Sequence, residues 1–268
     1  MRKNSLKAPD VFLLRPELFW KGKVMLTLFT DLDNTLIYSH RQLKDVSGYV
    51  PIEFINGKVQ SYINKKTLAY LNSAISQGVQ IIPVTTRNLE QYRRLQLPKF
   101  EYAILDNGGK LLHNNEDDLV WEMNSCRAAK DCVKAFRKSI QLLKKFDLTE
   151  YKYYDNRMLM VKSVYKDGLF DLLNSKLDTK KVSILHHGTK FYIAPVSYNK
   201  GLAVCRLKQI LDVRDCISAG DSSIDFPMAT YTDMFLTSNE LCTENNTVLL
   251  RDGVFSNGIF EYIFSLFK

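Results

Sequence analysis

Short apolar runs that end in polar residues recur through the first half of the chain, and stretches of helical periodicity separate them. Val24–Phe29 leads into acidic residues, Val79–Val84 into hydroxyl side chains, and Phe100–Leu105 into a further aspartate. Residues 65–77 carry apolar side chains on one helical face and are followed by a glycine, which commonly ends a helix. Strands alternating with helices form a parallel sheet covered on both faces. The predicted fold class is therefore α/β, with a Rossmann-like parallel sheet as its core.

The middle of the chain changes character and mixes helical and strand patterns. The apolar stripe of residues 123–146 predicts one long helix, and a strand at 158–164, a helix at 168–176 and a hairpin at 182–194 follow it. From Pro195 the α/β rhythm returns. The middle part therefore indicates an α+β insert in a larger domain.

These changes predict a division of the chain into an arm, a core and an insert. Residues 1–22 are basic and aperiodic, which predicts an N-terminal arm. The core is predicted to comprise residues 23–110 and 191–268, and the insert residues 111–190. An insert of roughly eighty residues is close to the usual size of a small domain.

A predicted hairpin directly follows the first strand and its aspartates. Glu53–Val59 contains Asn56-Gly57 between flanks of alternating apolar residues, which is a strong hairpin signal. We call residues 38–63 the flap. Because the flap follows the aspartates so closely, we expect it to border whatever they bind.

The composition is that of a globular protein with a full core, since 46% of the 268 residues are apolar and 25% are charged. The five cysteines are scattered without a C-x-x-C pair, which argues against a disulfide framework and a zinc knuckle and favours a reducing cytoplasm. No stretch approaches the roughly 20 apolar residues of a membrane span. The net charge of +8 accompanies no nucleic-acid-binding motif. We therefore expect a cytoplasmic protein with no membrane or nucleic-acid partner, of undetermined oligomeric state.

Asp31 and Asp33 stand one residue apart at the end of the first predicted strand. The carboxyl ends of strands are where open α/β sheets bind their ligands. Like charges held close together raise one another's pKa, and a bound cation would relieve that repulsion. On this segment alone a simple turn is the alternative interpretation, because aspartate and asparagine often follow strands.

Later strand and helix ends supply groups that complement this pair. Thr85 ends the second predicted strand, and Lys200 opens a predicted helix. Asp221 and Asp225 follow the strand predicted at 216–219. If these ends meet at one edge of the sheet, the carboxylates make a site for a hard cation, and the lysine and threonine are left to hold an anion.

In order and spacing, these residues resemble the motifs of the haloacid dehalogenase-like (HAD) phosphatases. Asp31-Leu32-Asp33-Asn34-Thr35 matches their DxDxT motif, and Thr85-Thr86-Arg87 resembles the TGR motif of the Cof-type and sucrose-phosphatase-like branch. Lys200 fits the third motif, and Gly220 to Asp225 fits the GDxxxD motif. Asp106-Asn107-Gly108-Gly109 is similar to the segment that precedes the α+β cap of Cof-type members. The resemblance implies that the insert is such a cap.

The resemblance also implies a role for each matching residue. Asp31 would be the nucleophile that becomes an aspartyl-phosphate, and Asp33 the general acid and base. Thr85 and Lys200 would hold the phosphoryl oxygens. The residues expected to bind phosphate or substrate are Asn34, Thr85, Thr86, Arg87 and Lys200. The residues expected to bind Mg²⁺ are Asp31, Asp33 (through its backbone carbonyl), Asp221 and Asp225.

The chain departs from the family pattern at three positions. Ile224 stands where Cof-type members commonly have asparagine, Thr86 replaces the TGR glycine, and Asn34 stands where many members have glycine. None of these changes removes a catalytic functional group, so the resemblance implies an active enzyme.

The implied activity is a Mg²⁺-dependent phosphatase that hydrolyses a small phosphorylated metabolite, either a sugar phosphate or a phosphoglycerate-type ester. A phosphomutase on the same scaffold is an alternative, which would need cap arginines that rebind an intermediate; the candidates are Arg127, Arg137 and Arg157. A non-catalytic binding protein is the alternative from another class, because a fold does not by itself imply a function.

Overall fold

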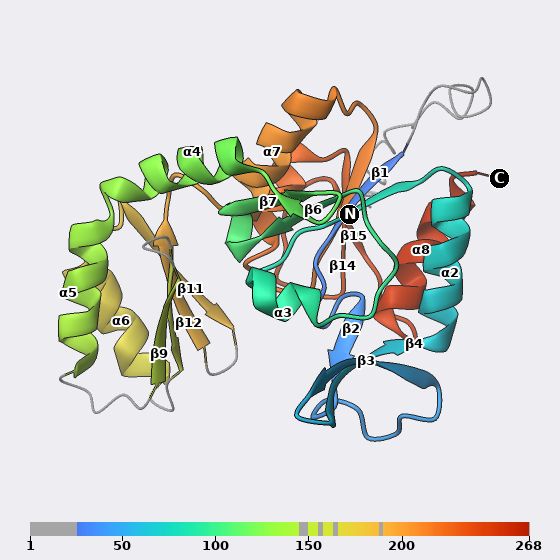
Figure 1. Cartoon of the computed structure of the whole chain (residues 1–268), viewed down its shortest axis with the longest axis horizontal. Helices are drawn as coiled ribbons and strands as arrows, with labels where there is room; N and C mark the ends of the chain where they lie inside the picture. Colours follow the sequence, from blue (N-terminus) through green and yellow to red (C-terminus); the bar gives the residue numbers. More distant parts are fainter. Residues whose placement is uncertain (1–25, 145–149, 155–157, 163–165, 188–189, 268) are drawn as a thin grey trace, which may run out of the picture.

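The computed structural model describes residues 26–144, 150–154, 158–162, 166–187 and 190–267, so the predicted arm lies outside the described residues. Its centre is a five-stranded sheet in the order β15-β14-β13-β1-β5, and all of its pairs are parallel (Figure 1). The strands are β1 (Thr27–Thr30), β5 (Gln80–Pro83), β13 (Cys216–Ala219), β14 (Met234–Thr237) and β15 (Thr247–Leu249). The predicted α/β class is confirmed.

The third predicted strand extends this sheet by a single bridge. Beyond the end of β5, Val84 bridges Ile104 of β6 (Tyr102–Leu105) in parallel, and the Thr85 N–H donates to the Ile104 carbonyl at 2.9 Å. A short 3₁₀ turn (η1, Asp106–Gly108) follows. The chain then reverses into β7 (Lys110–His113), which pairs antiparallel with β6, and β8 (Glu116–Asp117), which pairs antiparallel with β7.

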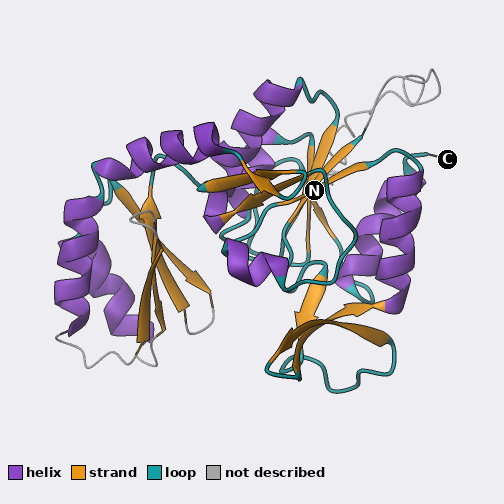
Figure 2. Ribbon diagram, in the orientation of Figure 1, coloured by secondary structure: helices purple, strands orange, loops and turns teal. Residues whose placement is uncertain are grey.

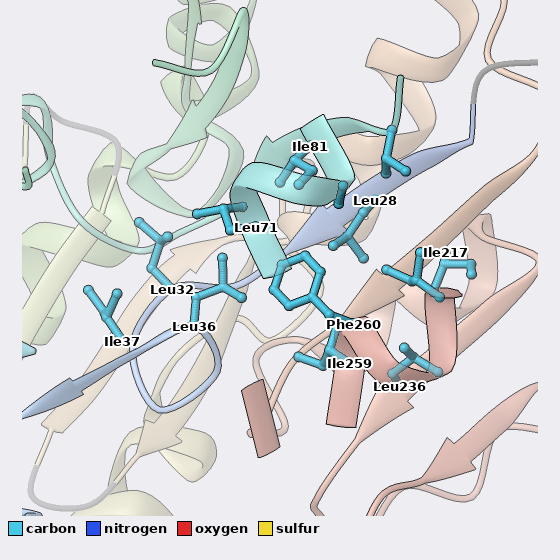
Figure 3. Packing of buried hydrophobic residues seen from close by; sticks show 14 of the residues in the cluster. Leu28, Leu32, Leu36, Ile37, Leu71, Ile81, Ile217, Leu236, Ile259 and Phe260 are labelled. Carbon is cyan, nitrogen blue, oxygen red and sulfur yellow. The ribbon is translucent and has the colours of Figure 1, made fainter. Parts of the chain in front are cut away.

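Helices cover both faces of the parallel sheet. On one face, α2 (Lys65–Ser76) and α8 (Phe255–Ser265) pack side by side, with Leu71 and Phe260 fully buried against Leu28 of β1 (Figure 3). On the other face, α7 (Lys200–Leu211) and the 3₁₀ helix η2 (Phe226–Tyr231) pack around Phe29. Successive residues of β1 thus point to opposite faces, and both faces are covered by apolar side chains.

Local capping signals set where the short helices begin. Asn64 caps α2 by accepting from the Lys66 N–H at 3.0 Å. Asn88 forms a reciprocal capping box with Gln91 at the start of α3 (Leu89–Arg93).

The flap is a small antiparallel sheet in the order β2-β4-β3, and the predicted hairpin at Asn56-Gly57 is confirmed. Its strands are β2 (Ile37–Ser39), β3 (Tyr49–Ile55) and β4 (Lys58–Asn64). The pairing of β3 with β4 shifts register on both sides of Glu53. Such irregularities redirect a side chain, and Glu53 is buried among polar partners.

The inserted region forms a second, antiparallel sheet in the order β11-β12-β10-β9, to the left in Figures 1 and 2. Its strands are β9 (Glu150–Tyr154), β10 (Met158–Lys162), β11 (Val182–His187) and β12 (Lys190–Pro195). Two helices, α5 (Val133–Lys144) and α6 (Lys166–Lys176), cover the face that is turned away from the core. The predicted hairpin of β11 and β12 is confirmed.

The single long helix predicted at 123–146 is wrong, because two helices occupy this part of the chain. The first, α4 (Leu119–Lys130), ends before Asp131, and α5 begins at Val133. Trp121 at the start of α4 packs in the core and donates its indole N–H to the Gly108 carbonyl, whereas Phe136 of α5 packs on the cap sheet. Residues of α4 and α5 thus pack in different hydrophobic clusters, so one straight helix could not reach both.

The packing suggests where the cap begins and ends. The boundary predicted at 110/111 falls within β7, and the boundary predicted at 190/191 falls within β12. We propose that the cap extends from about residue 131 to about residue 195, because β7, β8 and Trp121 pack with the core and β12 completes the cap sheet. Among the described residues, none of the helices is both long and apolar enough to cross a membrane.

We expect Gly201→Ala to destabilise the fold, because a Cβ at this position would lie 2.1 Å from the Pro227 carbonyl oxygen where α7 meets η2. Overpacking of this kind costs about 1–3 kcal/mol, measurable as a lower urea midpoint. Gly168→Ala in α6 is the matched control, since nothing lies within 4 Å of its added Cβ. That control is expected to leave stability equal or slightly higher; equal losses in both variants would contradict the argument.

Candidate active site

The candidate site lies where the order of the parallel strands reverses, between β1 and β13. Asp31 follows β1, and its backbone N–H donates to the Ala219 carbonyl at the end of β13 at 2.9 Å. Asp221 follows β13 after one residue. Such a switch point opens a crevice at the carboxyl ends of the strands, and this one is acidic.

A tight turn after β1 aims the paired aspartates. The Leu36 and Ile37 N–H groups both donate to the Leu32 carbonyl at 2.9 Å, and Asn34 adopts a left-handed conformation with φ of 61°. Asparagine tolerates this conformation better than most residues. Leu32 and Leu36 are fully buried, so the turn is anchored in the core while the carboxylates face the crevice. The turn considered as an alternative interpretation is therefore present, and it is the backbone conformation that positions the two carboxylates.

Lys200 is held between two carboxylates. Asn199 caps α7 by accepting from the Leu202 N–H at 2.9 Å, which places Lys200 at the first turn of the helix. The Lys200 Nζ lies 2.5 Å from Asp31 Oδ1 and 2.6 Å from Asp225 Oδ1. Only 2% of Lys200 is exposed. A lysine this deeply buried requires such partners.

The loop after β13 is built around Asp225. Its second oxygen accepts from the Ser222 N–H at 2.9 Å and from the Ser222 hydroxyl at 2.7 Å. Gly220 packs directly against Asp225, and a Cβ on Gly220 would lie 2.3 Å from the Asp225 Cβ. Only glycine fits at this position.

The acidic residues form a compact set of oxygen donors. One carboxylate oxygen each of Asp31, Asp221 and Asp225 lies within 4.8 Å of the others. The Thr35 hydroxyl stands 3.5 Å from an oxygen of Asp31 and 3.5 Å from an oxygen of Asp221. Magnesium prefers hard oxygen ligands of this kind. The donor set therefore fits the predicted Mg²⁺, and the excess of carboxylates over the single lysine favours a cation.

The charge balance of this cluster shifts its titration. Burial raises the pKa of Asp31 well above its usual value, and the neighbouring carboxylates add to this effect although Lys200 opposes it. Burial alone would lower the pKa of Lys200, but Asp225 and Asp31 outweigh it and the pKa is raised. Lys200 thus stays charged, and without a cation the cluster resists full ionisation.

Asp33 belongs to a different network, on the flap side of the crevice. Arg87 donates from Nε and Nη2 to the two Asp33 oxygens, both at 2.8 Å. Burial raises the pKa of Asp33, but the hydrogen bonds and the charge of Arg87 outweigh it, so the pKa lies below its usual value. Bidentate pairs of arginine and carboxylate are among the strongest polar contacts in proteins.

Glu53 of the flap completes this network and was not predicted as a site residue. Its side chain, only 4% exposed, accepts from Ser61 at 2.6 Å and pairs with Arg87 at 3.0 Å and Arg94 at 3.2 Å. The available signal was a glutamate within the apolar strand that precedes Asn56-Gly57. Its partner Arg87 lies far away in sequence, so only the folded chain reveals the pairing.

The remaining predicted phosphate-binding residues occupy different positions. Asn34, Thr86, Arg87 and Lys200 line the crevice. Thr85 is fully buried, and its hydroxyl oxygen accepts from the Arg87 N–H at 3.1 Å. The structure thus brings the strand ends together, while the roles implied by the resemblance stay predictions.

The crevice opens into a cleft of about 450 Å³ that core, flap and cap enclose together. The core contributes Asp31, Asp33 and Asp221, the flap contributes residues that include Arg41 and Gln60, and the cap contributes Met160, Lys190 and Tyr192. The cap sheet therefore faces the carboxylates.

Ile224 forms an apolar contact between the core and the cap. It is 5% exposed and packs in one cluster with Met158, Tyr192 and Ala194 of the cap sheet. This contact thus joins the loop after β13 to the cap. Of the three arginines proposed for a mutase, Arg127 and Arg137 are exposed and do not line the cleft, and Arg157 lies outside the described residues.

No family model matches the sequence, and no curated protein matches it. Solved structures match nearly its whole length. A sucrose-phosphatase from Synechocystis, solved with sucrose and phosphate, is 16% identical and has a TM-score of 0.65, over 91% of this chain and 98% of that chain. A phosphatase of the HAD superfamily from Bacteroides thetaiotaomicron is 13% identical with a TM-score of 0.60, over 92% of this chain and 97% of that chain.

A HAD-like hydrolase from B. subtilis matches in the same way, at 12% identity and a TM-score of 0.57, over 88% of this chain and 99% of that chain. The second and third of these structures are of proteins named as HAD-superfamily or HAD-like enzymes. The chain has the fold of the HAD-like phosphatases, with the cap inserted between the two parts of the core, and the fold predicted from the resemblance is confirmed.

We expect Lys200→Met to destabilise the protein by about 3–5 kcal/mol, because it leaves buried carboxylates without their cation. Urea unfolding at pH 7.5 in EDTA measures the loss. Lys66→Met, which breaks an exposed pair with Glu261, removes the same charge and is expected to change stability little. A Lys200→Met variant as stable as the Lys66→Met variant would contradict the proposed charge compensation.

We expect the free energy of unfolding in EDTA to rise as the pH is lowered through the raised pKa of Asp31. Above that pKa the folded protein bears the cost of an ionised, buried carboxylate, and the native state takes up the proton before the unfolded state does. Asp31→Asn removes this component, so its stability should vary less between pH 8 and pH 5. Parallel pH profiles for both proteins would contradict the assignment.

Proposed function

We propose that this chain is a phosphoric monoester hydrolase that acts on a small phosphorylated metabolite, a sugar phosphate or a phosphoglycerate-type ester. The observation that carries the proposal is the arrangement around Asp31, a carboxylate at the strand switch point in contact with a buried lysine and beside two further carboxylates. Two of the similar structures are of phosphatases, and one of these was solved with phosphate.

In this proposal Asp31 supplies the nucleophile. A carboxylate oxygen of Asp31 forms a bond to phosphorus, and the bond between phosphorus and the leaving-group oxygen breaks. Asp33 gives its proton to the departing oxygen, which leaves as an alcohol. Water then attacks the aspartyl-phosphate while Asp33 takes a proton from it, and phosphate and free Asp31 result. Lys200 holds Asp31 in place and offsets charge on the phosphoryl oxygens.

Asp31, Asp221, Asp225 and the backbone carbonyl of Asp33 would hold Mg²⁺. When bound, Mg²⁺ neutralises charge on the phosphoryl group and relieves the repulsion among the carboxylates. Thr85 and the crevice residues Asn34 and Thr86 are proposed to position the phosphate.

Arg87 sets a condition on the proton transfers. Its bidentate pairing favours ionised Asp33, the form that accepts a proton from water. To donate a proton to the leaving group, Asp33 must first bind one, so the guanidinium has to release at least one of its oxygens. Arg87 also pairs with Glu53 at 3.0 Å. When Arg87 releases Asp33, its positive charge therefore still has a carboxylate partner.

No specific observation favours a mutase, and the excess of carboxylates around Lys200 argues against a purely structural role for these residues, because unbalanced buried charge destabilises a fold. The scattered cysteines favour a cytoplasmic protein. The proposal therefore remains hydrolysis of a small soluble ester.

Turnover of p-nitrophenyl phosphate tests the proposal. We expect Mg²⁺-dependent release of nitrophenol that EDTA abolishes and that Asp31→Asn lowers by at least about 10³-fold, as expected when a nucleophile is lost. Asp215→Asn, a partly exposed carboxylate directly before β13 that does not line the cleft, is the matched control. A rate that is unaffected by Asp31→Asn, or no turnover of any phosphomonoester, would overturn the assignment.

A further inference from the structure

The two faces of the cap sheet differ in chemistry. The face toward α5 and α6 is apolar, with Leu159, Val161, Phe191 and Ile193 fully buried. Side chains alternate between faces along a strand, so Met160, Lys190 and Tyr192 share the opposite face, and these residues line the cleft. The face that looks onto the reacting carboxylates is therefore mixed apolar and cationic.

The strand register adds further lysines to this face. Lys152 of β9 stands opposite Met160, and Lys162 of β10 stands opposite Lys190. Opposed residues of an antiparallel pair project to the same side of the sheet. The face that carries Lys190 is therefore the lysine-rich face of the cap sheet.

The cations that line the cleft fall into two groups. Lys200, Arg87 and Arg94 are already paired with carboxylates of the chain. Lys190 on the cap and Arg41 on the flap have no ion pair among the described residues. The charge of Lys190 also lowers the pKa of Asp33, so the ammonium lies close enough to act on the reacting end of the cleft.

We propose that the substrate carries a second anionic group, a carboxylate or a second phosphate, on its leaving group, and that Lys190 and Arg41 bind this group. The inference rests on the proposed function. The phosphoryl group to be transferred is expected against Asp31 and Lys200, so a cation on the cap or flap side is left for the leaving group. Met160 and Tyr192 beside Lys190 offer contacts for its carbon skeleton.

The alternative is that these cations attract any phosphate ester without distinguishing among them. General steering of this kind raises association with every anionic substrate. A binding site for a second anion instead raises kcat/KM only for esters that possess one. Pairs of esters that differ in this group alone separate the two cases.

The test measures kcat/KM for two such pairs at constant ionic strength. The carboxylate pair is 3-phosphoglycerate and glycerol 3-phosphate, and the phosphate pair is fructose 1,6-bisphosphate and fructose 1-phosphate. We expect the more anionic member of at least one pair to be preferred about tenfold or more, the gain typical of one hydrogen bond to a charged group. The pair that shows the preference identifies the second anion.

Substitutions test whether Lys190 and Arg41 cause the preference for the more anionic ester. Lys190→Met and Arg41→Met are each expected to reduce the ratio of the two kcat/KM values severalfold, and Lys190→Arg is expected to restore most of it. Lys138→Met is the matched control, because Lys138 is an exposed cap lysine on α5, the helix that covers the opposite face. It should leave the ratio unchanged.

The outcomes also separate this inference from the proposed function. Turnover with equal kcat/KM within both pairs would overturn the inference and leave the phosphatase assignment intact. An equal loss for both members of a pair in Lys190→Met would assign Lys190 to general steering and overturn it as well. If no ester is turned over while the protein is folded by circular dichroism, the proposed function itself fails.

Discussion

The buried ammonium of Lys200 between Asp31 and Asp225 is the interaction on which the rest of the site depends. It joins three segments that are far apart in the sequence: the end of β1, the start of α7 and the loop after β13. Loss of one partner of a buried charge strongly destabilises a fold. The three segments must therefore meet so that both carboxylates contact the amine of Lys200. Gly201 and Gly220 make that approach possible, since a Cβ at either position would collide with a neighbouring segment.

The two aspartates of the first turn are separated by a single residue but lie in different electrostatic surroundings. Asp31 is buried in an acidic cluster that raises its pKa, and Asp33 is held by Arg87, which lowers its pKa. Neighbouring carboxylates that are pushed apart in this way can take different chemical roles. Glu53 extends the second network into the flap, so the position of Asp33 is coupled to a segment outside the parallel sheet.

The cap is joined to this centre by apolar contact as well as by the chain. Ile224, from the same loop that carries Asp221 and Asp225, packs on the cap sheet with Met158 and Tyr192. The acidic loop and the cleft-facing surface of the cap are thus neighbours, and a displacement of one shifts the other because tightly packed side chains transmit strain. This contact accounts for an apolar side chain within an otherwise polar loop.

The sequence by itself determined the parallel α/β core, the flap hairpin and the principal acidic and basic residues, because apolar periodicity, Asn56-Gly57 and polar strand ends are local signals. Only the tertiary structure decided that Arg87 pairs with Asp33 and Glu53, that α4 and α5 are separate helices, and that Lys190 faces the cleft. Each of these depends on which distant surface a segment packs against. A local pattern shows that a surface must be buried or paired, but only the folded chain shows its partner.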